Sequence, residues 1–186
     1  MTDAITQHQQ LLELLLARSV KRGTFTLASG QQSDIYIDVR LTSMSPEGLS
    51  LLGPLALTAI RKRSWQVDAV GGMTLGADPI SYAISYASNF APPLLRAFTV
   101  RKEAKAHGTG KQIEGPFRSG DHVVIIEDVI TTGASALRAI EAVSVAGGKI
   151  SGVIAVVDRE DGGKEAIATQ GYDVISLATI TELRSR

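Results

Sequence analysis

Apolar positions along this chain change their spacing in a regular way. Leu11, Leu12, Leu15 and Leu16 recur at helical spacing and predict an amphipathic helix over residues 5–21, ending before Gly23. Farther on, the unbroken apolar runs at 123–126 and 153–157 are typical of strands that are covered on both faces. The pattern therefore combines helices with fully buried strands.

Strands and helices alternate after the first helix. Such alternation predicts an α/β fold, in which a parallel sheet is flanked by helices on both faces. Ligands then bind beyond the carboxyl ends of the strands. The 186 residues show no repeat or linker and are interpreted as a single domain, 1–186. Helices are expected at 45–63, 77–88, 134–146 and 164–170, and strands at 24–27, 34–39, 67–70, 93–100, 123–127, 150–157 and 173–177.

The charge balance and the missing residue types narrow the class of protein. Lys+Arg and Asp+Glu both number 19, so the chain lacks the basic excess of a nucleic-acid binder. There are no cysteines, which excludes disulfides and thiolate metal sites. The first ten residues do not look like a leader, and no apolar run is long enough for a bilayer. We expect a cytoplasmic protein that binds neither nucleic acid nor membrane.

The strongest chemical signal follows the apolar strand at 123–126. Two adjacent acids, Glu127 and Asp128, precede a turn rich in Thr, Gly and Ser that starts a helix. The N–H groups of that turn and the positive helix end suit a phosphate monoester, whereas the acids would repel one and suit sugar hydroxyls. A ribose 5-phosphate satisfies both demands. The alternative is that the acids merely end a strand and residues 131–135 merely cap a helix.

This segment resembles the phosphoribosyl-diphosphate signature of the type I phosphoribosyltransferases. It lacks the Gly-Lys-Ser/Thr ending of a Walker-type loop. The resemblance implies a Rossmann-like parallel sheet flanked by helices, with a small N-terminal hood from about residues 1–45 plus C-terminal residues. It also implies a loop that closes over the active site.

A second signal is the charged stretch at 101–110, where cationic and titratable side chains precede Gly108 and Gly110. Glycine hinges and cations suit a lid that closes over an anion, although a solvated charged loop is the commoner explanation. The pattern looks like the catalytic loop of the orotate phosphoribosyltransferase family, in which the loop of one subunit reaches the site of its dimer partner. The resemblance implies that Lys105 stabilises charge as pyrophosphate leaves.

Three further segments look like the same family. The pattern at 25–38 is similar to its hood, although Ala28 stands where many members carry Lys. Arg159 follows a buried strand, where the family's Arg holds the orotate carboxylate; a bidentate pair fits this chemistry, and a capping or surface role is the alternative. Gly71 and Gly72 match the family's pyrophosphate-side loop, with residues 73–76 in place of its proline-containing version.

The resemblance gives each residue an expected role. Lys105 and Asp128 are the expected catalytic residues, and Thr131 and Arg159 the orotate-binding ones. Mg²⁺ is the expected cofactor, bound mainly through donor and water rather than by protein ligands. The expected partners are 5-phosphoribosyl diphosphate, orotate and a second copy of the chain, with the lid shared across subunits. The residues expected to bind the donor are Arg101, Lys102, Lys105, His107, Glu127, Asp128, Val129, Ile130, Thr131, Thr132, Gly133, Ala134 and Ser135.

Three other functions stay open at this point. A purine phosphoribosyltransferase would share the scaffold, but Arg159 and the lid pattern favour orotate. A non-catalytic donor sensor would need a DNA-binding segment or a basic face, which the first 20 residues do not supply. The third is an unrelated nucleotide-binding α/β domain.

Overall fold

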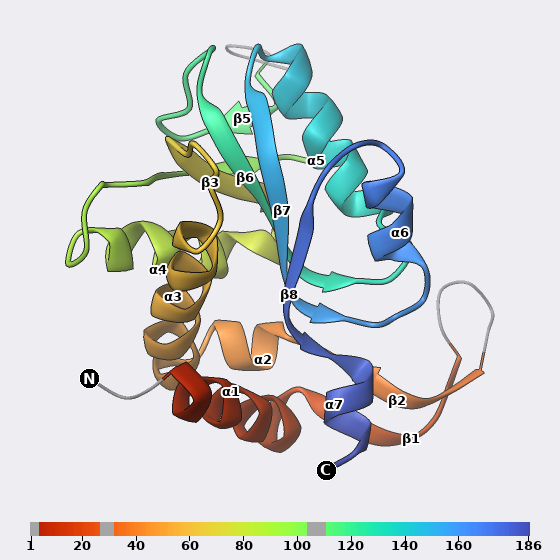
Figure 1. Ribbon diagram of the computed structural model, residues 1–186. Coiled ribbons are helices and arrows are strands. Elements are labelled where there is room, and N and C mark those ends of the chain that lie inside the picture. Colours follow the sequence, from red (N-terminus) through yellow and green to blue (C-terminus); the bar gives the residue numbers. More distant parts are fainter. Residues whose placement is uncertain (1–3, 27–31, 104–110) are drawn as a thin grey trace.

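The computed structural model describes residues 4–26, 32–103 and 111–186 and confirms the α/β class (Figure 1). Strands and helices alternate through the chain as the apolar spacing predicts. In chain order the elements are α1 (Ala4–Arg18), β1 (Val20–Thr26), β2 (Gln32–Ile37), α2 (Arg40–Ser43), α3 (Pro46–Arg61), β3 (Ala69–Met73), α4 (Ala77–Ser88), β4 (Arg96–Val100), β5 (Ile113–Glu114), β6 (His122–Ile130), α5 (Ala134–Val145), β7 (Lys149–Asp158), α6 (Gly163–Ala168), β8 (Val174–Thr179) and α7 (Ile180–Arg184).

The central sheet has the strand order β5-β4-β3-β6-β7-β8 within the described residues. All neighbouring pairs are parallel except β4 and the short edge strand β5. The chain runs outward from β3 to β4 and then returns to the other side of β3 for β6, so the strand order reverses there. Sheets of this type bind ligands at such a reversal, beyond the carboxyl ends of the strands.

Side chains of β6 alternate between two apolar cores, one on each face of the sheet. Val124 and Ile126 belong to the cluster that includes α1, α3 and α4. Val123 and Ile125 belong to the cluster that includes α5 and α6. These helices lie on opposite sides of the sheet in Figure 1. The fully apolar run is therefore explained by a strand that is covered on both faces.

Several predicted boundaries were wrong, each for a packing reason. The first helix ends at Arg18, not at 21, because Val20 already pairs with Ile37 in the hairpin β1–β2. Gly71 and Gly72 lie inside β3 rather than in a loop, and both are buried. A Cβ at Gly72 would lie 2.0 Å from the Ile126 carbonyl oxygen, so close strand packing requires glycine there.

The strand β6 is longer than predicted and continues through Ile130. Its pairing with β7 persists as far as Ile130 and Asp158, so both acids of the motif lie within the strand. Elements α2, β5 and α7 were not predicted, since each has five residues or fewer and its apolar pattern is too short to recognise.

The two ends of the chain meet below the sheet (Figure 1). Helix α7 begins with a capping box between Thr179 and Glu182, and His8 of α1 contacts Glu182 at 3.0 Å. Arg184 reaches Asp34 of β2 at 2.6 Å. Helices α1 and α7 and the hairpin therefore form one cover over the sheet edge. Within the described ranges, no helix is both long and apolar enough to cross a bilayer.

Candidate active site

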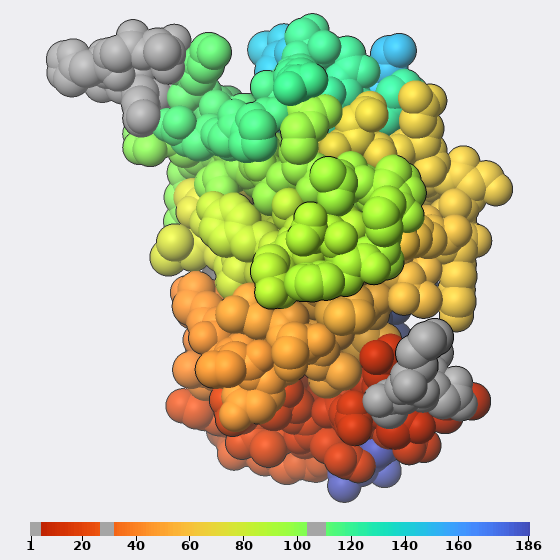
Figure 2. All heavy atoms as spheres, turned by 90° about the vertical axis from the view of Figure 1, so that its left-hand side faces the viewer, coloured from red at the N-terminus to blue at the C-terminus, as the bar shows by residue number. Residues whose placement is uncertain are grey.

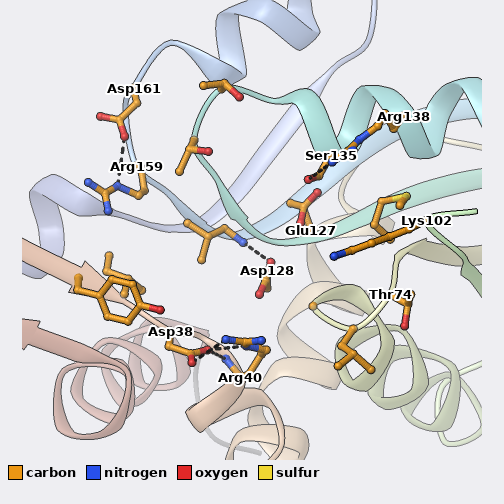
Figure 3. Close-up of a pocket in the computed structure, with 18 residues that line it drawn as sticks. Asp38, Arg40, Thr74, Lys102, Glu127, Asp128, Ser135, Arg138, Arg159 and Asp161 are labelled. Atoms are coloured by element: carbon orange, nitrogen blue, oxygen red, sulfur yellow. Dashed lines mark hydrogen bonds and ion pairs between the residues drawn. The ribbon is translucent and has the colours of Figure 1, made fainter. Parts of the chain in front are cut away.

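A cavity of about 920 Å³ opens at the carboxyl edge of the sheet, at the reversal of strand order (Figure 3). This volume lies at the upper end of the range for small-molecule sites. Its lining comes from the hairpin, from α2 and α5, and from the segments that follow β3, β4, β6 and β7. The lining residues are Tyr36, Ile37, Asp38, Arg40, Met73, Thr74, Leu75, Gly76, Lys102, Glu127, Asp128, Val129, Thr131, Thr132, Ser135, Arg138, Arg159 and Asp161.

One wall is the turn between β6 and α5. The N-cap of α5 is Gly133, with a left-handed φ of 79°, and the helix has no side-chain capping hydrogen bond. The first-turn N–H groups are therefore not satisfied by Thr or Ser hydroxyls, contrary to the capping interpretation of residues 131–135. Free N–H groups and the positive helix end make this turn an anion cup beside Thr131 and Thr132.

The two acids of β6 form the floor next to the anion cup. Glu127 is 6% exposed, and its Oε2 has no hydrogen-bond partner among the described residues. Asp128 is half-buried, and its Oδ1 accepts a hydrogen bond from the Val129 N–H at 2.9 Å. The Asp128 carboxylate packs against Gly76, where a Cβ would lie 2.6 Å from its Cγ. Glycine at 76 thus allows the loop after β3 to approach Asp128.

Burial raises the pKa of Glu127 to about 9, and the neighbouring charge of Asp128 adds to the shift. At neutral pH the Glu127 carboxyl therefore holds its proton. As a neutral acid it can donate a hydrogen bond to a hydroxyl oxygen, while the Asp128 carboxylate accepts one. The pair suits a diol better than two like charges would.

We predict a pH dependence of stability that Glu127→Gln removes. In the unfolded chain this carboxyl ionises near its ordinary pKa of 4.5, whereas the folded chain holds the proton up to about pH 9. Its contribution to the free energy of unfolding is complete below pH 4.5 and is lost as pH rises toward 9, by about 1 kcal/mol per pH unit. Urea denaturation between pH 5.5 and 8.5 should show a smaller pH slope in the variant. An equal slope in both proteins would contradict the assignment.

Positive side chains surround the cavity and differ in how they are paired. Arg159 is 8% exposed, its Nε lies 3.2 Å from Asp161, and its Nη2 donates to the Ser33 hydroxyl at 3.4 Å. Its backbone N–H donates to the Ile130 carbonyl at 2.9 Å, which fixes it against the end of β6. A buried guanidinium so held can present its remaining donors to a carboxylate.

Arg40 is fixed by a two-point ion pair with Asp38. Its Nε and Nη2 donate to the two carboxylate oxygens at 2.8 and 2.9 Å, and this hydrogen bonding holds the pKa of Asp38 below its ordinary value. Figure 3 shows the Arg40 guanidinium facing the side of the cavity that holds Asp128. Lys102 and Arg138 line the opposite end, near Glu127. Among the described residues, no carboxylate forms an ion pair with either of these two cations, so that end of the cavity is positive.

The structure brings most of the predicted site residues to this cavity. Predicted residues that line it are Lys102, Glu127, Asp128, Val129, Thr131, Thr132, Ser135 and Arg159. Gly133 and Ala134 lie in the anion cup but contribute backbone only. Arg101 lies outside the lining and is 3.8 Å from Glu114. The Ile130 side chain is buried in the core, so this residue can offer the donor only its backbone. Lys105, His107 and Ala28 lie outside the described residues.

Several residues that line the cavity were not among the predicted site residues. Arg138 carries a detectable signal, because it lies three residues after Ser135 and thus on the same helix face. Thr74 and Gly76 belong to the segment compared with the family's pyrophosphate-side loop but were given no role of their own; they follow the true end of β3, which was misplaced by three residues. Arg40 has no local signal, since only the tertiary packing of α2 turns it toward β6.

The chain is similar to known proteins over nearly its whole length. No protein-family model matches it. An orotate phosphoribosyltransferase from Rhodopirellula baltica is 42% identical over 176 residues, which cover 92% of this chain and 91% of the relative. A crystal structure of the Mycobacterium tuberculosis orotate phosphoribosyltransferase is 41% identical with a TM-score of 0.84, covering 95% of this chain and 98% of that one. Another structure of that enzyme, in complex with 5-phospho-alpha-D-ribosyl 1-diphosphate, has a TM-score of 0.79 and 33% identity, with coverage of 98% and 93%.

The sheet order, the anion cup and these similarities agree on the class of protein, a phosphoribosyltransferase of the type I fold. Because relatives above 40% identity align with nearly the full chain, the class can be narrowed. The chain belongs to the orotate phosphoribosyltransferase family and is a pentosyltransferase enzyme.

Proposed function

We propose that this cavity transfers ribose 5-phosphate from 5-phospho-α-D-ribose 1-diphosphate to orotate. The products are pyrophosphate and orotidine 5′-monophosphate, a step of pyrimidine biosynthesis. One observation carries the proposal: an uncapped helix N-terminus and two strand acids open into one cavity, beside a wall that carries Lys102 and Arg138. A sugar phosphate needs both of these surfaces.

The donor's phosphate monoester fits the anion cup at Thr131–Ser135, where backbone N–H groups bind it. Its ribose then lies over the floor, with hydroxyls against Glu127 and Asp128. The neutral Glu127 donates to one hydroxyl oxygen, and the Asp128 carboxylate accepts from another. This placement keeps the Asp128 carboxylate away from the phosphate.

The donor's pyrophosphate extends toward the positive end of the cavity, where Lys102 and Arg138 lie. As the bond to pyrophosphate breaks, negative charge grows on the leaving group and positive charge on the ribose ring. Fixed cations stabilise the first of these charges. By resemblance, Lys105 on the lid adds to them and is the main catalytic cation. The Asp128 carboxylate lies on the ribose side, where it stabilises the second charge.

Orotate fits the side of the cavity next to the hairpin. Arg159 is the buried cation there, and the carboxylate of orotate is its expected partner. Thr131 contacts the base from the anion-cup side. The ring nitrogen N1 of orotate bonds to the anomeric carbon as the bond to pyrophosphate breaks, and the N1 proton passes to water or to the departing pyrophosphate, so no strong protein base is required.

Mg²⁺ is the proposed cofactor. Among the residues that the structure describes, no three His, Cys, Asp or Glu side chains cluster as a metal site. The oxygen groups of the cavity are of the kind that Mg²⁺ prefers, and this ion usually keeps several waters. Donor oxygens and water would therefore hold it, with Asp128 in reach through water. When bound, it neutralises charge on the pyrophosphate.

A panel of bases tests the reaction. With the donor and Mg²⁺, pyrophosphate release should be rapid with orotate and weak with uracil, adenine, hypoxanthine or xanthine. A purine phosphoribosyltransferase would prefer adenine or hypoxanthine. A donor sensor would release no pyrophosphate with any base, and that outcome would overturn the proposal.

We further propose a cytoplasmic homodimer in which each lid covers the partner's site, and a single domain whose hood is built from residues 1–45 and the C-terminal residues. Exposed apolar side chains support an interface. Tyr82, Tyr86, Phe90 and Leu94 are 53–70% exposed on α4 and the segment that follows it. Figure 2 shows this segment in yellow-green across the middle of one face. Exposed apolar patches of this kind mark protein contacts.

Mixing two inactive variants tests the shared site. Lys105→Ala disables the lid and Asp128→Ala disables the floor. If each lid serves the partner, a mixed dimer has one intact site of two. After random exchange, half of the dimers are mixed, so activity should return to about a quarter of the wild-type value. Mixtures as inactive as their parents would contradict sharing of the lid.

A further inference from the structure

Four side chains form a line of hydrogen bonds beside the positive end of the cavity. The Thr74 hydroxyl donates to Asp78 Oδ2 at 2.7 Å. The Thr99 hydroxyl donates to Asp78 Oδ1 at 2.8 Å. The oxygens of Tyr82 and Thr99 lie 2.9 Å apart. The line thus joins the loop after β3, the end of β4 and the first turns of α4.

The direction of these bonds follows from the number of hydrogens. A carboxylate only accepts, so each threonine gives its one hydroxyl hydrogen to Asp78. Thr99 then has none left for the tyrosine, and Tyr82 must donate to Thr99. Both oxygens of Asp78 are therefore occupied by hydroxyl groups. Asp78 itself is not among the residues that line the cavity, so it reaches the site only through Thr74.

These bonds fix the loop Thr74–Gly76 while leaving two of its donors free. The Thr74 N–H donates to the Val100 carbonyl at 2.9 Å, and the Asp78 N–H donates to the Leu75 carbonyl at 3.3 Å. Within the described part of the chain, the N–H groups of Leu75 and Gly76 donate no hydrogen bond. The loop lines the cavity, and Figure 3 shows Thr74 on the same side as Lys102.

We propose that Asp78 is a positioning residue for the loop Thr74–Gly76, which by resemblance is the pyrophosphate-side loop, and that its two threonine bonds hold the free N–H groups of Leu75 and Gly76 toward the leaving group. The inference rests on the proposed function, since it requires a pyrophosphate at this end of the cavity. The Thr74 hydroxyl already donates its hydrogen to Asp78 and cannot donate it to the anion. The anion must therefore be bound by backbone N–H groups of the loop. Two adjacent N–H groups in a turn are a known form of anion site.

The loop also touches the catalytic floor. Gly76 packs so closely on the Asp128 carboxylate that a Cβ would lie 2.6 Å from it. A loop that shifts toward β6 would therefore displace Asp128. Asp78 consequently positions the leaving-group loop and the ribose-side acid together.

A double-mutant cycle tests this inference. Asp78→Ala and Thr74→Val each break the bond between the two side chains, and Thr74→Val keeps the side-chain shape. Each should raise the KM for the donor and the inhibition constant of pyrophosphate about tenfold or more, on the scale of a lost charge-assisted hydrogen bond. The KM for orotate should stay within about twofold. The double variant should be no worse than the worse single variant, because both act through one bond.

Two matched variants control for general damage to α4. Ser81→Ala removes a buried hydroxyl that donates to Ala77 within the helix, and donor KM should not change. Asp78→Asn keeps one acceptor oxygen and should recover part of the loss. Additive effects of Thr74→Val and Asp78→Ala, or an equal rise of both KM values, would overturn the proposal. If the wild-type protein fails to use orotate, the proposed function is overturned. The role of Asp78 can then still be tested by calorimetry, which measures the binding of pyrophosphate alone to the same variants.

Discussion

Arg159→Ala should raise the KM for orotate about 30-fold or more while leaving the donor KM nearly unchanged. The guanidinium is buried at the end of β7, held by Asp161 and Ser33. Removing one partner of a desolvated charge pair costs about 2–5 kcal/mol, which corresponds to at least a 30-fold loss of affinity. Steady-state kinetics with each substrate varied in turn gives both KM values.

Two controls separate this contact from damage to the fold. Arg63→Ala removes an exposed arginine paired with Asp173 away from the cavity, and both KM values should stay at wild-type levels. Arg159→Lys keeps the charge but loses the two-point geometry, so its orotate KM should lie between those of wild type and alanine. Equal weakening of orotate and donor in Arg159→Ala would remove the carboxylate role.

Lys105→Ala should lower kcat about 10²-fold or more. The described part of the cavity already carries Lys102 and Arg138 near the expected pyrophosphate. The resemblance adds Lys105 as the cation that acts on the charge developing in the transition state, and losing one such group costs about this much. Stopped-flow measurement of a single turnover would show whether the loss lies in the chemical step.

Lys111→Ala is the matched control for Lys105→Ala. Lys111 is an exposed lysine just beyond the lid and does not line the cavity. Lys111→Ala removes one positive charge, as Lys105→Ala does, but it should leave kcat within about twofold of wild type. Near-normal turnover in Lys105→Ala would exclude that side chain from the chemistry.

The fold class, and the position of Glu127 and Asp128 at one cavity, could be predicted from the sequence for a local reason. An apolar strand, two acids and a turn of Thr, Gly and Ser occupy one continuous segment, 123–135. The positions of the side chains in this segment are set by the end of one strand and the start of the next helix. Adjacent residues thus suffice to predict a phosphate near Thr132 and hydroxyl partners at Asp128.

Residues that depend on packing between distant segments were not predictable. The glycines of β3 look like a loop, because nothing local shows that Gly72 faces the Ile126 carbonyl of a neighbouring strand. Arg40 reaches the cavity only because α2 and Asp38 hold it there. The proton on Glu127 also depends on tertiary burial, which no neighbouring residue in the chain reveals.

The most direct test of the central claim is a crystal structure of the protein soaked with ribose 5-phosphate. We expect the phosphate at the N–H groups of Thr131–Ser135 and the sugar hydroxyls against Glu127 and Asp128. A phosphate bound elsewhere in the cavity, or sugar hydroxyls that do not contact these two acids, would contradict the account.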